Sequence, residues 1–273
     1  MEQKKLEELR EAARRIRVGI IKGTHAAKSG HPGGSLSIAD VMAYLYFAEM
    51  NIDPANPKME NRDRFVLSKG HCAPALYATL ANRGFFPVEE LTTLRKIDSR
   101  LQGHPDMKLT PGVDMSAGSL GLGISAAAGM ALAGKIDNKD YRVYTVVGDG
   151  ESEEGQVWEA SMFAAHYKLD NLCVILDWNG LQIDGPVTEV MNPTPHDKKF
   201  EAFGFHVISI DGHDFNAIEA AFAEAKTVKG KPTAIIIKTV KGKGVSFMEN
   251  KVNWHGSAPN DEQCAAALAE LEA

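Results

Sequence analysis

The chain has 273 residues, of which 44% are hydrophobic and 24% charged, as expected for a soluble globular protein with a sizeable core. It carries 30 basic and 36 acidic residues and no dense Lys/Arg block, so nucleic acid is not expected as a partner. Three cysteines lie far apart without CxxC spacing, which favours a reducing cytoplasm over a disulfide framework or a zinc site. No apolar run approaches the roughly 20 residues needed to cross a membrane, so no membrane association is expected.

The first half of the chain is rich in helical patterns and in loops that contain glycine and proline. Residues 2–28 predict an amphipathic helix, because apolar residues recur near helical spacing at Leu6, Leu9, Ala13, Ile16 and Ile20. Further helices are expected near 37–50, 72–82 and 88–97. The loops between them read SGHPGGS, LSKGH, LQGHPD and SAGSLGLG.

Residues 118–134, GSLGLGISAAAGMALAG, predict a Gly-rich loop that opens a helix of small residues at 123–133. The stretch contains GxGxxA, but a dinucleotide-binding motif should follow a strand, and no β-branched run precedes this one. Two interpretations stay open. The start of the helix faces an anion, or its Ala and Gly face packs tightly on another helix.

The second half alternates between strand-like and helix-like segments. Short β-branched runs predict strands at 142–147, 171–176, 205–210 and 233–240, and helices are expected at 154–168 and 214–228. Apolar strands separated by helices are typical of a parallel sheet covered on both faces. We therefore expect an α/β fold, with a doubly wound, mostly parallel sheet, in one domain over residues 1–273 whose N-terminal part is helical and loop-rich.

Acidic residues follow the first of these strands, in the sequence GDGESEEG at 148–155. Asp149 comes directly after one strand and Asn179, in DWNG, after the next. The carboxyl ends of neighbouring parallel strands meet at one edge of a sheet, so both side chains can converge on one cation. A carboxylate, an amide oxygen and a nearby backbone carbonyl suit Mg²⁺, and Gly150 lets backbone N–H groups approach a phosphate. The alternative is a plain surface turn, which the matching DWNG disfavours.

Four histidines lie beside glycine or proline in loops. They are His31 in SGHPGGS, His71 in SKGHCAP, His104 in QGHPD and His255 in NWHGS. A neutral imidazole donates one hydrogen bond and accepts another, so a cluster of them suits hydroxyl-rich or carbonyl substrates that exchange protons. The remaining histidines, among them His213, are interpreted as structural. The lysines of KTVKGKGVS at 238–246 could reach a phosphate, but lysines in loops are usually solvated, and this second interpretation is preferred.

These motifs together resemble the N-terminal, diphosphate-binding domain of transketolases. GDG followed about 30 residues later by Asn is similar to the thiamine diphosphate motif. The resemblance extends from about residue 10 to 260 through KSGHPGGSLSIADV, DRFVLSKGHCAPALYATL, QGHPD, GSLGLGISAAAGMA and FEAFGFHVISIDGHD. It implies the thiamine diphosphate-binding fold and transfer of a two-carbon ketol unit from a ketose phosphate to an aldose phosphate, as in the pentose phosphate pathway.

The resemblance also assigns residues to roles. It implies Mg²⁺ held by Asp149, Asn179 and the carbonyl of Leu181. It implies that His31, His71, His104 and His255 surround the reacting carbon. The remaining cofactor positions that it implies are His71, Gly118, Leu120, Gly150, Glu154, Glu159 and, again, Asn179.

The resemblance covers only the first of the three domains that transketolases usually carry in one chain. It therefore implies the N-terminal subunit of a split transketolase, active only with a C-terminal partner subunit in an α2β2 heterotetramer that supplies the pyrimidine-binding and C-terminal domains. Alternatives are a subunit of another split thiamine diphosphate enzyme, either a 2-oxo acid dehydrogenase or a relative of deoxyxylulose phosphate synthase, and a non-catalytic homologue that acts as a binding partner. Which sugars are used, and whether Ca²⁺ or Mn²⁺ replaces Mg²⁺, stay open.

Overall fold

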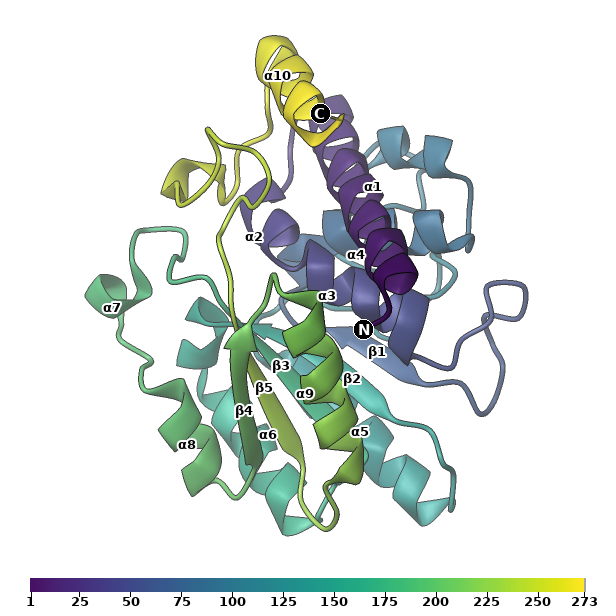
Figure 1. Cartoon of the computed structure of the whole chain (residues 1–273), viewed down its shortest axis with the longest axis vertical. Helices are drawn as coiled ribbons and strands as arrows, with labels where there is room; N and C mark the ends of the chain where they lie inside the picture. The colour runs from purple at the N-terminus through teal and green to yellow at the C-terminus, as the bar shows by residue number, and fades with distance from the viewer. Residues whose placement is uncertain (273) are drawn as a thin grey trace.

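A five-stranded parallel sheet forms the centre of the protein in a computed structural model, which describes residues 1–272 (Figure 1). The strand order is β1-β2-β3-β5-β4, and every neighbouring pair is parallel. The strands are β1 (Arg64–Leu67), β2 (Val143–Gly148), β3 (Leu172–Trp178), β4 (His206–Asp211) and β5 (Thr233–Lys238). The four strands predicted from the sequence are confirmed. β1 is an additional strand that the sequence did not predict, because RFVL is short and begins with a charged residue.

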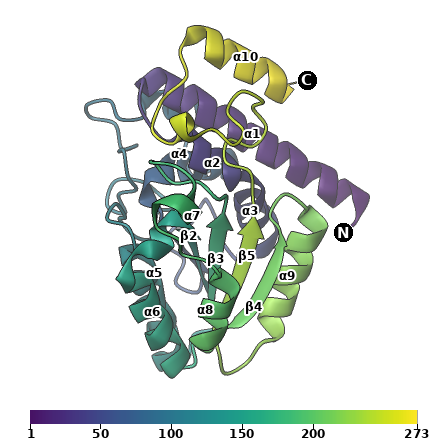
Figure 2. The same cartoon turned by 90° about the vertical axis from the view of Figure 1, so that its left-hand side faces the viewer.

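Helices cover both faces of this sheet, as expected for a doubly wound fold (Figure 2). Alternate strand residues point to opposite faces: Tyr144 and Val146 of β2 enter one core, and Val143 and Val147 enter the other. The first core is closed by α1 (Gln3–Ala27), α3 (Ala39–Tyr44), α4 (Ala73–Arg83) and α9 (Phe215–Thr227). The second core is closed by α5 (Leu122–Ile136), α6 (Gly155–His166) and α8 (His196–Ala202).

Several segments differ from the sequence expectation in extent. The helix expected at 37–50 is divided into α3 and a π-helix, η1 (Leu45–Glu49), and the one expected at 88–97 is a 3-10 helix that ends earlier, η3 (Val88–Thr93). Short helices that were not expected are α2 (Pro32–Ser37), η2 (Gly70–Cys72), η4 (Gly150–Glu153), α7 (Val187–Val190), α8 (His196–Ala202) and η5 (Val252–Trp254). A C-terminal helix, α10 (Asp261–Glu272), packs on α1.

The carboxyl ends of the strands point toward α1, α2 and α10 (Figure 2). Loops that carry chemically active residues follow four neighbouring strands at this edge: 68–72 after β1, 149–154 after β2, 179–186 after β3 and 239–255 after β5. In parallel α/β sheets, ligands bind beyond this edge. The fold thus brings together residues that lie up to 187 positions apart in the chain, from 68 to 255.

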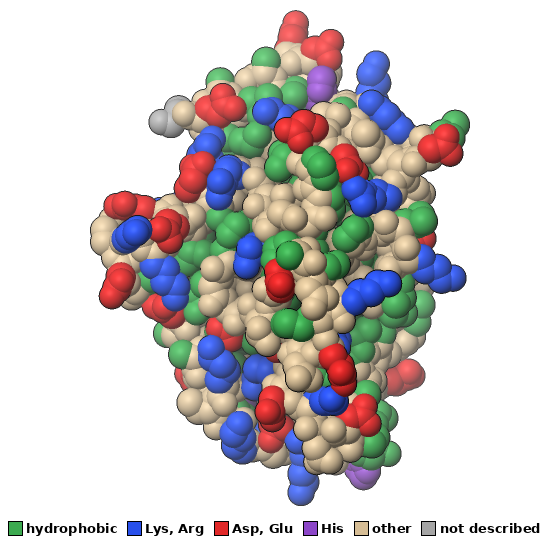
Figure 3. All heavy atoms as spheres, turned by 90° about the vertical axis from the view of Figure 1, so that its right-hand side faces the viewer, with side chains coloured by type: hydrophobic (Ala, Val, Ile, Leu, Met, Phe, Trp, Pro, Cys, Tyr) green, Lys and Arg blue, Asp and Glu red, His purple; other side chains and the backbone are tan. Residues whose placement is uncertain are grey.

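One face of the molecule is mixed in charge. On the face seen in Figure 3, acidic and basic side chains are interspersed with hydrophobic ones, without a block of a single sign. Within residues 1–272, no helix is both long enough and apolar enough to span a membrane.

Candidate functional site

A cavity of about 490 Å³ lies where the four strand ends meet. Ten of the twelve predicted site residues line it: His31, His71, Gly118, Leu120, Asp149, Gly150, Glu154, Asn179, Leu181 and His255. His104 does not line the cavity directly, but a Cβ built on Gly118 would lie 3.7 Å from its ring, which places His104 at the rim. Glu159 is exposed on α6 outside the cavity.

The Asp149 carboxylate and the loop after β3 approach each other closely. Asp149 Oδ1 accepts a hydrogen bond from Gly150 N at 2.8 Å, and Oδ2 accepts one from Gly180 N at 2.5 Å. Asn179 Oδ1 accepts from Leu181 N at 3.1 Å. Burial raises the pKa of Asp149 to about 7, and the nearby charge of Asp177 adds to the effect. A cation beside the Asp149 carboxylate would stabilise its ionised form and lower this pKa.

Asp149, Asn179 and Leu181 therefore line the same cavity, and they can offer a carboxylate, an amide oxygen and a backbone carbonyl. Within residues 1–272, no three His, Cys, Asp or Glu side chains are grouped to hold a metal by themselves. Mg²⁺ commonly takes only one or two carboxylates from the protein and completes its shell with water and phosphate oxygens. The donor set fits such an ion.

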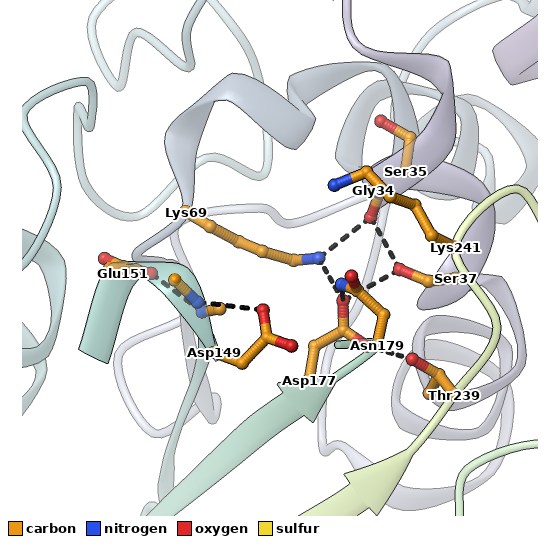
Figure 4. A network of polar contacts seen from close by, with 12 residues as sticks. Gly34, Ser35, Ser37, Lys69, Asp149, Glu151, Asp177, Asn179, Thr239 and Lys241 are labelled. Carbon is orange, nitrogen blue, oxygen red and sulfur yellow. Dashed lines mark hydrogen bonds and ion pairs between the residues drawn. The ribbon is translucent and has the colours of Figure 1, made fainter. Parts of the chain in front are cut away.

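A buried ion pair lies beneath this position (Figure 4). Lys69 Nζ donates to Asp177 Oδ2 at 2.6 Å and to Gly34 O at 2.8 Å, and both side chains are almost completely inaccessible to solvent. Asp177 Oδ2 also accepts from Ser37 Oγ, and Oδ1 accepts from Thr239 Oγ1. The charge of Asp177 outweighs the effect of burial and raises the pKa of Lys69, so this pair is charged and saturated with hydrogen bonds.

The amide of Asn179 is oriented by the same carboxylate. Its Nδ2 donates to Asp177 Oδ2 at 2.9 Å, so its oxygen points the other way. An amide held in this manner presents oxygen rather than nitrogen toward a cation.

Lys241 corrects one interpretation of the sequence. This lysine was expected to be solvated, but only 2% of its surface is exposed, and it lines the cavity. Its Nζ donates to Leu181 O at 2.9 Å and lies 3.0 Å from His255 Nδ1. Burial lowers its pKa, and no carboxylate of residues 1–272 lies within ion-pair distance. A buried cation without a carboxylate partner favours an anionic ligand.

Three of the four predicted histidines form a cluster at the cavity. The ring centroids of His31, His71 and His255 are 5.2 to 5.5 Å apart. Burial lowers the pKa of His31 to about 4 and that of His255 to about 3, helped by nearby cationic groups, so both rings are neutral near pH 7. His31 Nδ1 is buried and has no hydrogen-bond partner among the described residues. A neutral ring with a free nitrogen, as in His31, suits a ligand that carries hydroxyl or carbonyl oxygens.

The acidic residues after β2 have different roles. Glu151 is fully buried and accepts from Ser68 Oγ, Gly121 N and Gly148 N at 2.6 to 2.9 Å, which fixes the Gly-rich loop against β1 and β2. A Cβ on Gly123 would lie 2.5 Å from Ser68 Cα, so only glycine allows this approach at the start of α5. Glu154 is exposed at the cavity edge.

The fold and this cavity define an α/β protein with a polar cavity at the carboxyl edge of a parallel sheet, the edge at which such folds bind ligands. A family model described as "Transketolase, thiamine diphosphate binding domain" matches residues 9–271, and the chain belongs to this family.

Two kinds of relative are similar to the chain. It is 52% identical over 243 residues to 6-deoxy-6-sulfo-D-fructose transketolase subunit SqwG of Clostridium sp. (strain MSTE9), covering 89% of the chain and 88% of that protein. It is 43% identical over 252 residues to an apulose-4-phosphate transketolase subunit of Phocaeicola vulgatus, covering 92% and 89%. It is 48% identical over 256 residues to human transketolase, covering 93% of the chain but 40% of that protein.

Solved structures agree with this assignment. Transketolase from Leishmania mexicana superposes with a TM-score of 0.91 at 34% identity, over 97% of the chain and 41% of that structure. The chain thus spans about two fifths of the full-length transketolases that it matches.

Four residues that build the site were not identified from the sequence: Lys69, Glu151, Asp177 and Lys241. Asp177 and Lys69 stand within DWNG and LSKGH, motifs already singled out for their neighbours. Both residues lie close to the end of a strand, and this position could have identified them as candidate site residues.

Proposed function

We propose that the chain is the thiamine diphosphate-binding N-terminal subunit of a transketolase, which transfers a two-carbon ketol unit from a ketose phosphate to an aldose phosphate. One observation carries the proposal. A buried cation without a carboxylate partner, Lys241, and the oxygen donors of Asp149, Asn179 and Leu181 face one cavity. Such a site is complementary to a diphosphate with its divalent cation, and family membership names the cofactor.

Mg²⁺ is proposed to lie at the oxygens of Asp149, Asn179 and Leu181. Lys241 Nζ now donates to the Leu181 carbonyl, and it would turn toward phosphate oxygens when that carbonyl binds the metal. The backbone at Gly118, Leu120 and Gly150 would hold the diphosphate, with His71 and Glu154 as further cofactor contacts. Glu159 lies on the exposed side of α6 and is proposed to act at a contact between subunits.

When bound, thiamine diphosphate would supply a nucleophilic carbon that is able to carry a two-carbon unit. The residues of this chain bind and orient the sugar. His31 and His255, neutral and partly buried, would hydrogen-bond carbonyl and hydroxyl oxygens and move protons between them. His104, at the rim, would hold the sugar as it enters. Burial lowers the pKa of His31 and of His104, and the nearby charge of Arg95 lowers both further. That charge would favour an anionic sugar.

A partner chain is proposed to complete the site. The relatives of similar length are named as subunits, whereas the chain spans about 40% of human transketolase. Exposed apolar side chains lie at the start of α5 and along α6, two helices that pack together, and they would be covered by the partner. They are Leu122, Met162, Phe163 and Tyr167. Two copies of each chain, α2β2, is the symmetric arrangement we propose.

The substrates are proposed to be sugar phosphates of the pentose phosphate pathway. The named relatives act on 6-deoxy-6-sulfo-D-fructose and on apulose 4-phosphate, so a sulfonated or branched-chain sugar is the second candidate. The cytoplasm is the proposed compartment, since Cys72, Cys173 and Cys264 are free and buried thiols. The family match to transketolase favours this reaction over a 2-oxo acid dehydrogenase or a deoxyxylulose phosphate synthase. A cavity that keeps its oxygen donors and histidines disfavours a non-catalytic binding partner.

Reconstitution tests the proposed reaction. The chain is purified alone and assayed with a ketose phosphate, an aldose phosphate, Mg²⁺ and thiamine diphosphate, and the assay is repeated with the C-terminal partner. We expect activity only in the complex. Full activity of the chain alone would contradict the split-subunit proposal. The stoichiometric complex is also assayed with a sulfonated and with a branched-chain sugar, and no activity with any of these substrates would favour a non-catalytic role.

Calorimetry tests the proposed cofactor site in the same complex. Asp149→Ala should abolish Mg²⁺-dependent binding of thiamine diphosphate and leave the fold intact. Asp170→Ala, which removes a surface carboxylate paired with Lys135, is the matched control and should bind normally. Unchanged affinity in Asp149→Ala would disprove the metal assignment.

Turnover tests the proposed role of His104. His104→Ala should lower kcat by about 10²–10⁴-fold and leave cofactor affinity nearly unchanged, because we propose that the ring contacts the sugar rather than the cofactor. Parallel losses in kcat and cofactor affinity would instead make His104 a cofactor or structural residue.

A further inference from the structure

The fifth strand end, after β4, contributes no residue to the cavity, but it carries a polar network. His213, in the loop between β4 and α9, places Nδ1 2.7 Å from Asp40 Oδ2 on α3. Arg17 on α1 donates to both oxygens of Asp40, at 3.0 and 2.6 Å. We refer to these three side chains as the Arg17–Asp40–His213 network. All three side chains are 85% or more buried, so water competes little for their hydrogen bonds.

The hydrogen bonds of His213 define its tautomer. The backbone N–H of Val240 donates to His213 Nε2 at 2.9 Å, so Nε2 carries no proton. The proton must then be on Nδ1, where it is donated to Asp40. Burial alone would raise the pKa of Asp40, but Arg17 and His213 outweigh it and lower that pKa, so Asp40 is an ionised acceptor.

The same network holds the backbone on the other side of Lys241. Arg17 Nε donates to Lys243 O at 3.1 Å. Val240 and Lys243 therefore flank Lys241, and each is bonded to one end of the network. The loop of His213 also approaches closely, since a Cβ on Gly212 would lie 2.6 Å from Thr239 Cγ2. Gly212 N donates to Lys238 O at 2.8 Å.

We propose that Arg17, Asp40 and His213 are positioning residues that fix segment 239–243, so that the ammonium of Lys241 faces the cavity. No member of the network lines the cavity, so it acts through Lys241. What Lys241 binds rests on the proposed function, namely the diphosphate of the cofactor. The positioning of segment 239–243 does not rest on the proposed function. The test can therefore distinguish a failure of the positioning role from a failure of the proposed function.

The competing interpretation is that the network only ties α1, α3 and the β4–α9 loop together. A structural tie lowers stability in general when it is broken, whatever residue stands at position 241. A positioning network loses its effect on cofactor affinity once the Lys241 ammonium is removed. A double-mutant cycle between His213 and Lys241 distinguishes these cases.

The variants follow from the tautomer. His213→Ala removes the acceptor of Val240 N. His213→Gln can accept that N–H with its amide oxygen and donate its amide N–H to Asp40, so it should restore the wild-type behaviour. The matched control is His206→Ala. His206 is on β4, away from segment 239–243, and its imidazole is also bonded to a carboxylate, that of Glu224.

Calorimetry with thiamine diphosphate and Mg²⁺, on the chain assembled with its partner, is the first measurement. We expect His213→Ala to raise Kd about tenfold, His213→Gln to stay within about twofold of wild type, and His206→Ala to have no effect. In a Lys241→Met background, His213→Ala should change Kd by less than about twofold. A tenfold loss that persists in that background, or a Gln variant as weak as the Ala variant, would overturn the proposal.

Hydrogen exchange of the full chain without cofactor is the second measurement. Amides in 239–243 should exchange at least about tenfold faster in His213→Ala, but not in His213→Gln or His206→Ala. If the wild-type complex binds no thiamine diphosphate, the proposed function fails, and this measurement alone decides the positioning role. Unchanged exchange in His213→Ala would overturn it.

Discussion

The floor and the mouth of the cavity each contain a buried lysine, but the two lysines are in opposite states. We call Ser37, Lys69, Asp177 and Thr239 the floor, and His31, Lys241 and His255 the mouth. In the floor, Lys69 meets a carboxylate that three further groups also contact, and its pKa is raised. In the mouth, Lys241 meets a carbonyl and an imidazole, and its pKa is lowered by burial.

This difference separates residues that hold the site together from residues that await a ligand. A buried ion pair with all its hydrogen bonds needs nothing from outside, so the floor contributes to the stability of the chain alone. A buried cation without a counter-charge costs free energy until an anion arrives. The mouth therefore contributes to binding at the expense of stability. Substitutions in the two regions should affect different measurements.

The largest expected effect is on stability, from the floor. Lys69→Met leaves the Asp177 carboxylate buried without its cation, which should cost about 3–5 kcal/mol in the free energy of unfolding. Urea unfolding of the chain alone measures this. Lys135→Met, which breaks a partly exposed pair with Asp170, is the control and should cost about 1 kcal/mol or less. A cost below about 1 kcal/mol for Lys69→Met would remove the distinction between floor and mouth.

The next effect is on binding, from the mouth. Lys241→Met should leave the free energy of unfolding unchanged or raise it, because a buried cation without a carboxylate partner is replaced by an apolar chain of similar length. The affinity for thiamine diphosphate should fall about 10–100-fold, as for loss of a charged hydrogen bond. Calorimetry of the complex and urea unfolding of the chain measure the two quantities. Lys238→Met, at the exposed end of β5, is the control. A large loss of stability in Lys241→Met would show that Lys241 belongs with the floor.

The fold could be predicted from the sequence to a large extent, because buried parallel strands contain runs of β-branched and other apolar residues. RVYTVV and TAIIIK are such runs, and both are strands. RFVL was missed because four residues that begin with arginine carry too little pattern. The positions of Asp149 and Asn179 could also be predicted, since the carboxyl ends of adjacent parallel strands must meet.

The charge partners in the cavity could not be predicted, because they depend on contacts between distant segments. Lys69 and Asp177 are 108 residues apart, and nothing local indicates that they pair. Lys241 and Lys243 share the context KGKG, yet one is 2% exposed and the other is only partly buried. The difference arises from the backbone contacts of Val240 and Lys243 with His213 and Arg17, which are set by the tertiary fold.

The smallest expected effect is a difference in the pH dependence of stability between the two regions. The pKa of His255 is lowered from its ordinary 6.5 to about 3, first by burial and then by Lys241 and His31. Between these values the unfolded chain binds more protons than the folded one, so acid favours unfolding. The contribution of His255 is complete above pH 6.5 and is lost progressively as the pH falls toward 3. The pKa of Asp177 in the floor is also lowered, because Lys69 and its hydrogen bonds outweigh burial, so its contribution is lost only below the ordinary aspartate value of 3.8.

A comparison of pH 7 with pH 5 therefore tests the mouth without disturbing the floor. His255→Asn keeps an acceptor for the Lys241 ammonium but does not titrate, so it should lose less stability than wild type between these two pH values. Since His255 is partly exposed, the difference should be on the order of 1 kcal/mol. Urea unfolding at both pH values measures it, with His206→Asn at a solvent-facing pair as the control. An equal loss in His255→Asn and wild type would mean that His255 is solvated in the folded chain, and the mouth would then extend only to His31 and Lys241.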